Sequence, residues 1–436
     1  MKLPLFKYLL PVVFACISIQ SCKKEKDKEP EAFVTGFSPG FGPYYSLVTI
    51  AGSGFSDGIT ENKVIINGME ADVQTASPTE LKVEVPFGAD SGPISVQVAG
   101  KSTATSQDIF HYSYTGMVST FVRQGYVASP RGLAIDGQGN LFVTNHGGSA
   151  FIKKVSASGT VSLVAGSGLF GYVDGPAATA QFGSLSGVVI SAQGTVYVSD
   201  WGNHCIRKIS PAGIVSTLAG NGTAGFADGA GTAAQFNRPE GLALDAQENV
   251  LVADSYNNRI RLITPAGVVS TLAGSSAQGG FADGPVGRAQ FYWPNGVAVD
   301  AAGTVYVADT GNGRIRKISS TGTVSTIAGT AQCGGTDGAA KTATFNYPTN
   351  IALNARGKIC VAEANGYRIR LLDPDGFTST LAGVGNACNS GATGGYVDGA
   401  GSAAQFDSPR GVAFGPTGEV YVADEGNSCI RKITLN

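Results

Sequence analysis

Hydrophobic residues in this chain occur in short runs that turn residues interrupt. From about residue 117 onward the runs are rich in valine, isoleucine, leucine and threonine, and Gly, Asp, Asn or Pro separates them. Four such runs follow one another at Gly241–Asp245, Asn249–Asp254, Arg259–Thr264 and Val268–Ala273. Runs of this kind predict β-strands, and no copy has an apolar stripe with helical spacing.

The unit of four runs recurs six times. An acid closes the second run in most copies, and it returns every 54 to 61 residues: Asp200, Asp254, Asp309, Glu363 and Asp424, with Asn145 in the first copy. A fixed period with turn residues at fixed offsets indicates one supersecondary unit stacked on copies of itself. Four antiparallel strands per unit, repeated radially, predict a six-bladed β-propeller.

The two ends of the array predict how the ring closes. The last copy stops at Ile430–Asn436 and lacks its fourth run, whereas an extra run, Val118–Val122, precedes the first copy. We expect Val118–Val122 to complete the last blade, because closure removes open sheet edges. A proline opens five of the six copies, and we call it the head proline: Pro130, Pro239, Pro294, Pro348 and Pro409. Ser184 takes that place in the second copy.

The repeat resembles the NHL family in its six-bladed form. The matching pieces are P-x-G-L-A-x-D, V-A-D-x-x-N-x-R-I-R and the glycine-bounded outer strand, over about residues 117–436. The resemblance implies the fold rather than a function, since NHL-type propellers include lyases, sensor domains, RNA binders and protein-binding platforms. The recurring Arg-Ile-Arg-Lys is therefore interpreted structurally, with its arginine paired to the acid of its own or a neighbouring blade.

Residues 32–115 form a separate unit ahead of the propeller, which takes 116–436. Short alternating runs with frequent turn signals predict an immunoglobulin-like sandwich, so the whole chain is all-β. The motifs Ile50–Phe55, Asn67-Gly68 and Val85-Pro86 resemble the IPT/TIG family, whose members act as spacers or as binding modules beside other domains.

The first residues predict export and lipidation. Residues 1–22 have two early lysines, an apolar stretch from Leu9 to Ile19, and Ile19-Gln20-Ser21-Cys22, which looks like a lipobox with Cys22 as the lipidated residue. Residues 23–31 form a charged flexible tether. It resembles tethers of Bacteroidetes-type lipoproteins and implies an outer-membrane lipoprotein on the cell surface or the periplasmic face. The lipid would be the only membrane anchor.

The net charge argues against one class of partner, and two cysteines are placed to form a disulfide. The net charge is −2 with few charges in total, which argues against nucleic acid because phosphate binding needs a concentrated basic surface. Cys333 and Cys388 lie in equivalent loops of successive blades, and an exported compartment permits disulfides. We therefore hypothesise a bridge between these two cysteines.

Function on a repeated scaffold is expected where the copies differ. The residue after the head position of each copy varies and should lie near the channel mouth, while aromatic residues follow the V-A-D run. These mouth residues are Arg131, Glu240, Asn295, Thr349 and Arg410, with Leu185-Ser186 in the second copy. Aromatic faces with a few polar groups suit a sugar or a peptide. The candidate ligand-binding residues are Arg131, His146, Trp201, His204, Glu240, Tyr256, Tyr292, Trp293, Asn295, Tyr367 and Arg410.

Enzymatic alternatives have weaker support in the sequence. NHL-type amidating lyases hold zinc with three histidines, but this chain has only His111, His146 and His204, and His111 lies in the sandwich. No nucleophile context is recognisable. We expect no metal, no cofactor and no catalytic residue, and a non-catalytic module that binds a glycan or a protein. The alternative is a metal-assisted lactonase or lyase in the central channel, with Glu240, Asn295 and Glu363 as oxygen ligands.

Overall fold

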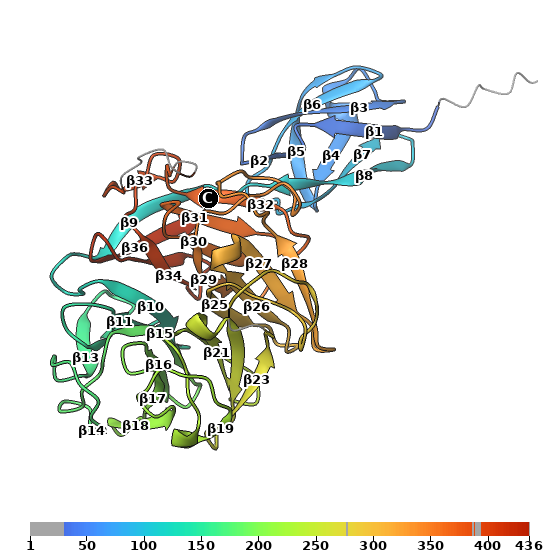
Figure 1. Cartoon of the computed structure of the whole chain (residues 1–436). Helices are drawn as coiled ribbons and strands as arrows, with labels where there is room; N and C mark the ends of the chain where they lie inside the picture. The colour runs from blue at the N-terminus through green and yellow to red at the C-terminus, as the bar shows by residue number, and fades with distance from the viewer. Residues whose placement is uncertain (1–29, 276–277, 386–387, 389–393, 436) are drawn as a thin grey trace, which may run out of the picture.

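The chain folds into two domains built from β-strands (Figure 1). The computed structural model describes residues 30–275, 278–385, 388 and 394–435. The predicted signal at 1–22, Cys22 and most of the tether at 23–31 lie outside the described residues. Within those described, the only helical segments are single 3₁₀ turns: η1 (Ile59–Glu61), η2 (Gly231–Ala233), η3 (Ser255–Asn257) and η4 (Thr310–Asn312). No helix among them is long and apolar enough to cross a membrane.

The first domain is an eight-stranded immunoglobulin-like unit. Its strands pair in the order β1-β3-β6-β5-β4-β7-β8-β2. Alternate residues along each strand enter one core around Val48, Ile50, Val83, Val96 and Phe110, as the period-two pattern requires. The strands are β1 (Phe33–Ser38), β2 (Phe41–Gly42), β3 (Leu47–Ser53), β4 (Asn62–Ile66), β5 (Met69–Ala76), β6 (Glu80–Glu84), β7 (Gly92–Val98) and β8 (Thr103–Tyr112).

The second domain is the predicted six-bladed propeller, with one inner strand of each blade around the centre (Figure 1). Blades 1 to 3 contain, from the inside outward, β10 (Pro130–Ile135), β11 (Leu141–Asn145), β12 (Ile152–Val155), β13 (Val161–Ala165); β15 (Leu185–Ile190), β16 (Val196–Asp200), β17 (Cys205–Ile209), β18 (Ile214–Ala219); and β20 (Pro239–Leu244), β21 (Val250–Asp254), β22 (Arg259–Ile263), β23 (Val268–Ala273).

Blades 4 to 6 repeat this order. They contain β25 (Pro294–Val299), β26 (Val305–Asp309), β27 (Arg314–Ile318), β28 (Thr323–Ala328); β29 (Pro348–Leu353), β30 (Ile359–Glu363), β31 (Arg368–Leu372), β32 (Thr378–Ala382); and β34 (Pro409–Phe414), β35 (Val420–Asp424), β36 (Cys429–Leu435), β9 (Gly116–Val122). Two-residue strands from the long loops add to four outer edges: β14 (Gly175–Pro176), β19 (Gly229–Ala230), β24 (Gly284–Pro285) and β33 (Gly399–Ala400).

Ring closure follows the prediction. β9, which comes before the first blade in sequence, pairs antiparallel with β36 at the end of the chain, with Val118 opposite Ile433 and Val122 opposite Ile430. The last blade thus takes its outer strand from the front of the domain. The closed ring has two faces. The upper face carries the loops that enter each inner strand and the loops that follow each second strand. The lower face carries the two tight hairpins of each blade.

The repeated arginines form buried clamps in blades 2 to 6. Each guanidinium is fully buried and binds the acid that ends the second strand of its own blade at 2.6–3.1 Å. It also binds the aspartate of the loop that leads into that blade, at 2.5–2.7 Å. The ring centroid of a buried loop phenylalanine lies 4.9–5.2 Å from each guanidinium carbon. The five arginines are Arg207, Arg261, Arg316, Arg370 and Arg431.

These clamps confirm that the repeated charges are structural, and they extend the prediction. The aspartates of the loops that lead into the blades also take part, because they help to neutralise the buried arginines. Burial raises the pKa of Asp424 to about 6, and hydrogen bonds from Asn427 and Arg431 act in the opposite direction. Removing one partner from such a group leaves an uncompensated buried charge and costs about 3–5 kcal/mol.

One position of the repeat differs from the sequence interpretation, and one blade lacks the clamp. In the second copy Leu185, not Ser184, occupies the head position, because Leu185 pairs with Asp200 in the register in which Pro239 pairs with Asp254. Ser186 is therefore the residue at the channel mouth. In the first blade Lys153 stands at the clamp position beside Asn145, so this blade lacks the arginine.

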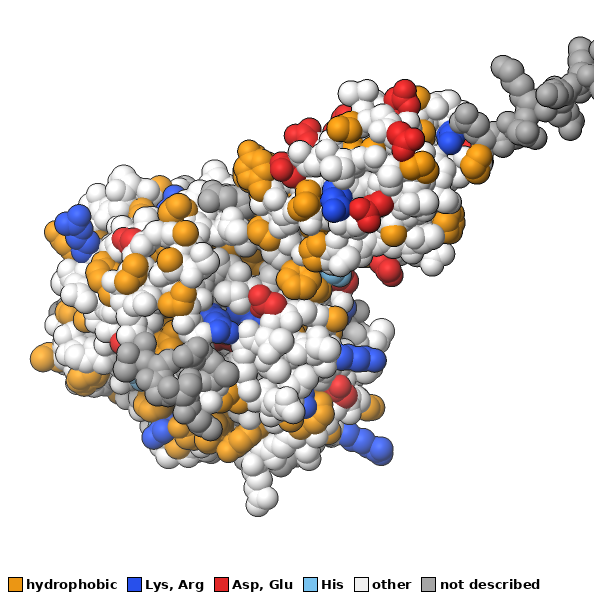
Figure 2. Space-filling view, turned by 90° about the horizontal axis from the view of Figure 1, so that it is seen from above, with side chains coloured by type: hydrophobic (Ala, Val, Ile, Leu, Met, Phe, Trp, Pro, Cys, Tyr) orange, Lys and Arg blue, Asp and Glu red, His pale blue; other side chains and the backbone are white. Residues whose placement is uncertain are grey.

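The first domain contacts the lower face of blade 5. Asp90 binds Arg356 at 2.7 Å, and Ser91 donates to Asp373 at 2.7 Å. The His111 ring stacks on Phe377 with 3.9 Å between the ring centroids. The space-filling view shows the domain projecting from the side of the propeller, with Lys and Arg scattered rather than gathered in a basic patch on this face (Figure 2).

Candidate functional site

A polar ring narrows the central channel at the upper face. The second residues of the inner strands supply it: Arg131, Ser186, Glu240, Asn295, Thr349 and Arg410. Only about 20 Å³ of space remains among them. Sequence analysis placed five of these residues at the mouth, and the structure brings them together there.

The ring is closed by its own contacts. Arg131 binds Glu240 at 2.7 Å, and Ser186 donates to the other carboxylate oxygen of Glu240. Arg410 binds Glu425 at 2.8 Å. Ser255 donates to Asn295 at 3.0 Å. Since these charges already satisfy one another, the mouth presents a neutral, hydrogen-bonded floor to the upper face.

Below the floor the channel widens toward the lower face. A cavity of about 380 Å³ is lined by the later, apolar residues of the six inner strands, among them Ile135, Ile190, Leu244, Leu353 and Phe414. The same repeat position supplies an apolar side chain in every blade. This cavity is the hollow that six converging strands leave, and its lining follows the repeat except at Asn350, which stands where the other five blades have glycine.

A chain of planar side chains surrounds the mouth on blades 1 to 4. His146 meets Trp201 edge to face at 5.2 Å between centroids. Arg238 lies over Trp201 and also over Tyr256. Tyr256 stacks with Trp293 at 6.2 Å, and Trp293 contacts Tyr292 at 4.5 Å. We call this set the aromatic arc: His146, Trp201, Arg238, Tyr256, Tyr292 and Trp293.

The arc is partly open to solvent. Tyr256 is 42% exposed and Trp293 is 36% exposed, and both are large aromatic residues beside a polar floor. The indole N–H of Trp201 is buried and has no hydrogen-bond partner among the described residues. Aromatic faces with an apolar body and a polar edge are typical of ligand-binding surfaces.

A left-handed turn recurs on the same face. The residue before the head proline has positive φ in all five blades that have this proline: Ser129 (39°), Arg238 (53°), Trp293 (49°), Tyr347 (60°) and Ser408 (50°). The loops after the second strands repeat the conformation in blades 2 to 6, at His204, Asn258, Gly313, Tyr367 and Ser428. Because this conformation recurs with the repeat it belongs to the scaffold, and what differs between blades is the side chain that it carries.

The histidines of this face are held neutral by their surroundings. Burial, then the charge of Arg131, lowers the pKa of His146, whose Nδ1 lies 3.2 Å from the Leu185 carbonyl. Burial, then the charge of Arg238, lowers the pKa of His204. The Arg238 backbone N–H donates to His204 Nδ1 at 3.1 Å, so that nitrogen carries no proton. Both histidines therefore position neighbouring groups.

The residues proposed as metal ligands do not form a metal pocket. Glu363 is fully buried inside blade 5, where it binds Arg370, and it does not line the channel mouth. Among the described residues, one group of three potential ligands has its atoms within 4.8 Å: His111, Asp373 and Asp375 at the domain junction. Asp373 there already binds Lys358 at 2.5 Å and Ser91, so its two oxygens are engaged.

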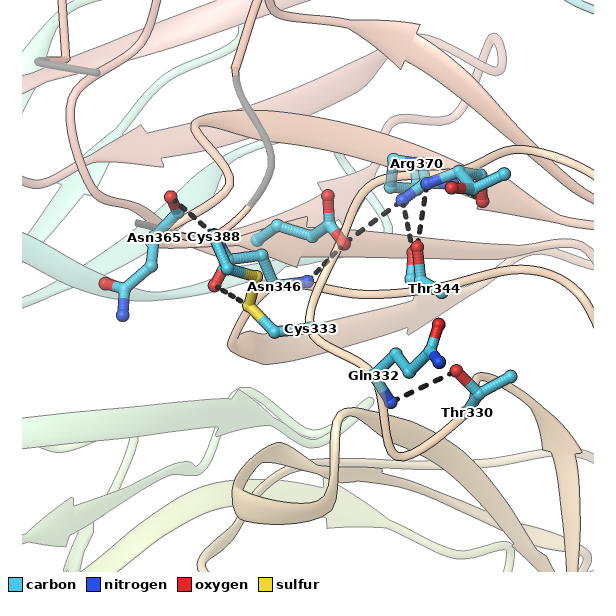
Figure 3. Close-up of a disulfide and its surroundings, with 10 residues drawn as sticks. Thr330, Gln332, Cys333, Thr344, Asn346, Asn365, Arg370 and Cys388 are labelled. Atoms are coloured by element: carbon cyan, nitrogen blue, oxygen red, sulfur yellow. Dashed lines mark hydrogen bonds and ion pairs between the residues drawn. A yellow bond between two sulfur atoms is a disulfide. The ribbon is translucent and has the colours of Figure 1, made fainter. Parts of the chain in front are cut away.

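A disulfide joins two upper-face loops beside blade 5 (Figure 3). Cys333 and Cys388 are bonded, with 5.8 Å between their Cα atoms. Asn346, between them in the view, contacts the sulfur of Cys333 and donates to the Asn365 carbonyl. The bridge fixes the loops before and after blade 5 to each other.

Sequence reasoning missed two residues of this face, Arg238 and Tyr347. Both directly precede a head proline and lie two positions before the mouth residues that sequence analysis compared. Their signal was available, because Ser129 and Ser408 stand at the same position in blades 1 and 6. A planar side chain in place of serine marks a departure from the repeat.

Comparisons with known families agree with the two domains. A model described as IPT/TIG domain matches residues 32–114, and a model of the NHL repeat matches 182–209, 236–261, 291–318 and 406–433. The chain therefore contains an IPT/TIG domain followed by a six-bladed NHL-repeat propeller, which confirms both resemblances.

The relatives of this chain include two that match 70% of its length. Protein SUPPRESSOR OF QUENCHING 1 of Arabidopsis thaliana is 28% identical over 335 residues, which cover 70% of this chain and 30% of that protein. NHL repeat-containing protein 2 of Bos taurus is 26% identical over 344 residues, covering 70% and 46%. This chain thus spans less than half the length of either relative.

Solved structures with a similar fold cover nearly the whole chain. A Bacteroides thetaiotaomicron protein of unknown function covers 94% of this chain and 99% of its own, with a TM-score of 0.57 and 19% identity. Two matching proteins are described as auxiliary nutrient binding proteins. The one from B. thetaiotaomicron has a TM-score of 0.55 and 16% identity, and the match covers 93% of this chain and 98% of that protein. The one from Bacteroides ovatus has a TM-score of 0.54 and 18% identity, and the match covers 94% of this chain and 99% of that protein. At these identities the likeness establishes the fold.

Proposed function

We propose that this protein is a non-catalytic glycan-binding module whose ligand lies on the aromatic arc. The observation that carries the proposal is the arc itself: planar side chains from four successive blades, partly exposed, beside a hydrogen-bonded polar floor. Pyranose rings present flat C–H faces and hydroxyl edges. Aromatic rings stack on the faces while nearby polar groups bind the edges.

The neighbourhood of known structures supports a binding role. Two proteins with a similar fold are described as auxiliary nutrient binding proteins, and we extend that role to this chain as part of the proposal. The lipobox, which lies outside the described residues, supports placement in the outer membrane with a lipid on Cys22 as anchor. A Cys22→Ala chain that still sediments with membranes would contradict that placement.

The test is binding of the purified chain to a glycan array, followed by calorimetry with the best oligosaccharide. Trp293→Ala and Tyr256→Ala should each weaken binding by about tenfold, because each removes one stacking surface. The control is Phe33→Ala, which removes an exposed aromatic ring from the first domain. A chain that binds no glycan but retains a protein in pull-downs would overturn the glycan proposal.

A further inference from the structure

Arg238 occupies the centre of the aromatic arc. Its guanidinium carbon lies 4.4 Å from the ring centroid of Trp201 and 4.6 Å from that of Tyr256. The planar group is thus covered by aromatic rings contributed by the loops after the second strands of blades 2 and 3. Stacking of this kind uses the faces of a guanidinium and leaves the N–H groups at its edge for hydrogen bonding.

Those N–H groups have no acceptor among the residues that the structure describes. Every other buried or half-buried arginine there donates to a carboxylate or a carbonyl oxygen: Arg131, Arg207, Arg259, Arg261, Arg314, Arg316, Arg368, Arg370, Arg410 and Arg431. The nearby carboxylate of Glu240 is already bound by Arg131 and Ser186. Arg238 therefore carries an uncompensated positive charge in a half-buried position.

The backbone holds Arg238 in place at a conformational cost. Its φ of 53° is left-handed, and its N–H donates to His204 Nδ1 at 3.1 Å. Pro239 follows directly, and its ring fixes the φ angle of Pro239 itself. This left-handed turn recurs before every head proline, and at Arg238 it places the guanidinium against two rings before any ligand arrives.

We propose that Arg238 binds an acidic group on the glycan, either a carboxylate or a sulfate, while Tyr256 and Trp293 contact the sugar rings beside it. The inference rests on the proposed function and names the class of ligand. Guanidinium edges match the paired oxygens of such groups, and charge-assisted bonds of this kind are strong where water is partly excluded. Neutral glycans would leave the charge unmatched.

The test compares three polysaccharides by affinity electrophoresis and calorimetry: polygalacturonate, its carboxyl-reduced form, and a sulfated galactan without carboxylates. We expect at least one acidic polymer to bind about tenfold to a hundredfold more tightly than the reduced form, with affinity falling as salt rises. The stronger of the two acidic polymers identifies carboxylate or sulfate as the group.

Arg238→Ala should abolish the preference for the acidic polymer, and Arg238→Lys should restore only part of it, because an ammonium keeps the charge without the planar stack. Arg288→Ala is the matched control, since Arg288 is an exposed arginine of the loop that enters blade 4. In a Trp293→Phe chain, Trp201 is the remaining tryptophan, and its fluorescence should change with the stronger of the two acidic polymers but not with the carboxyl-reduced polymer.

The outcomes separate the two proposals. Equal affinity for the acidic and the reduced polymer, or an equal loss in Arg238→Ala and Arg288→Ala, overturns the role of Arg238 and leaves glycan binding standing. Absence of binding to any glycan, acidic or neutral, removes the proposed function and this inference with it.

Discussion

The blade interiors and the upper face use arginine in opposite ways. In blades 2 to 6 each repeated arginine is fully buried between two carboxylates and a phenylalanine ring. Arg238 on the upper face lies between two rings and binds no carboxylate among the described residues. The difference shows that this scaffold neutralises the charges it repeats and leaves open the charge that occurs once.

Replacing one arginine from each region tests this contrast most strongly. Arg316→Ala should lower the free energy of unfolding by about 3–5 kcal/mol, because Asp309 would stay buried without its cation. Arg238→Ala should lower it by about 1–2 kcal/mol, the value of two half-buried cation–π contacts. Denaturant titration of both variants measures the two effects. Comparable losses of stability would mean that Arg238 is a structural residue like the others.

The repeat explains why the fold was predictable. A blade pattern that returns six times specifies strand number, blade number and closure by β9, since each of these follows from counting copies. The buried clamps were also within reach, because their acids and arginines recur at fixed offsets. Leu185 was misplaced because a single copy without proline gives no turn signal to set its register.

The site was less accessible to sequence reasoning. The mouth residues were found because the register of the inner strand fixes them, but their mutual pairing depends on distances across the channel, such as that from Arg131 to Glu240. The contact of Arg238 with Trp201 joins loops of two blades, and its positive φ is invisible in one sequence. Departures from the repeat indicate where to search; only the fold shows which of them meet.

The upper-face loops offer a second comparison, between blade 5 and the other blades. Around blade 5 the Cys333–Cys388 bond closes a loop across 55 residues of sequence. Replacing both cysteines by serine should lower the free energy of unfolding by about 2–4 kcal/mol, since the unfolded chain regains the entropy of that loop. Reductant should destabilise the native chain by the same amount and leave the double variant unchanged. Mass spectrometry that finds both thiols free would contradict the bridge.

The lower face shows that blade 5 differs there too. In blades 2 and 3 the first residue of the outer strand is exposed, with Ile214 at 49% and Val268 at 45%, whereas Phe377 at the same position is 8% exposed. Phe377 is covered by His111 and Phe41 of the IPT/TIG domain. Asp373 and Arg356 add polar contacts to the same domain. This departure from the repeat serves docking between domains.

Replacing Phe377 by valine, the residue that blade 3 has at this position, should weaken the docking between the domains. Of the changes considered, it should have the smallest effect on the free energy of unfolding. Phe377→Val removes the ring beneath His111, and Asp90→Ala also removes the ion pair with Arg356. Neither change enters a domain core, so we expect each domain to keep its unfolding transition within about 1 kcal/mol. Small-angle scattering should show a broader range of interdomain distances, and the linker at 113–115 should be cleaved faster by protease. Val268→Phe, the reverse change in blade 3, is the control and should alter neither measurement. Unchanged scattering and cleavage in the double variant would show that the linker alone sets the arrangement, and the departures of blade 5 would then need another explanation.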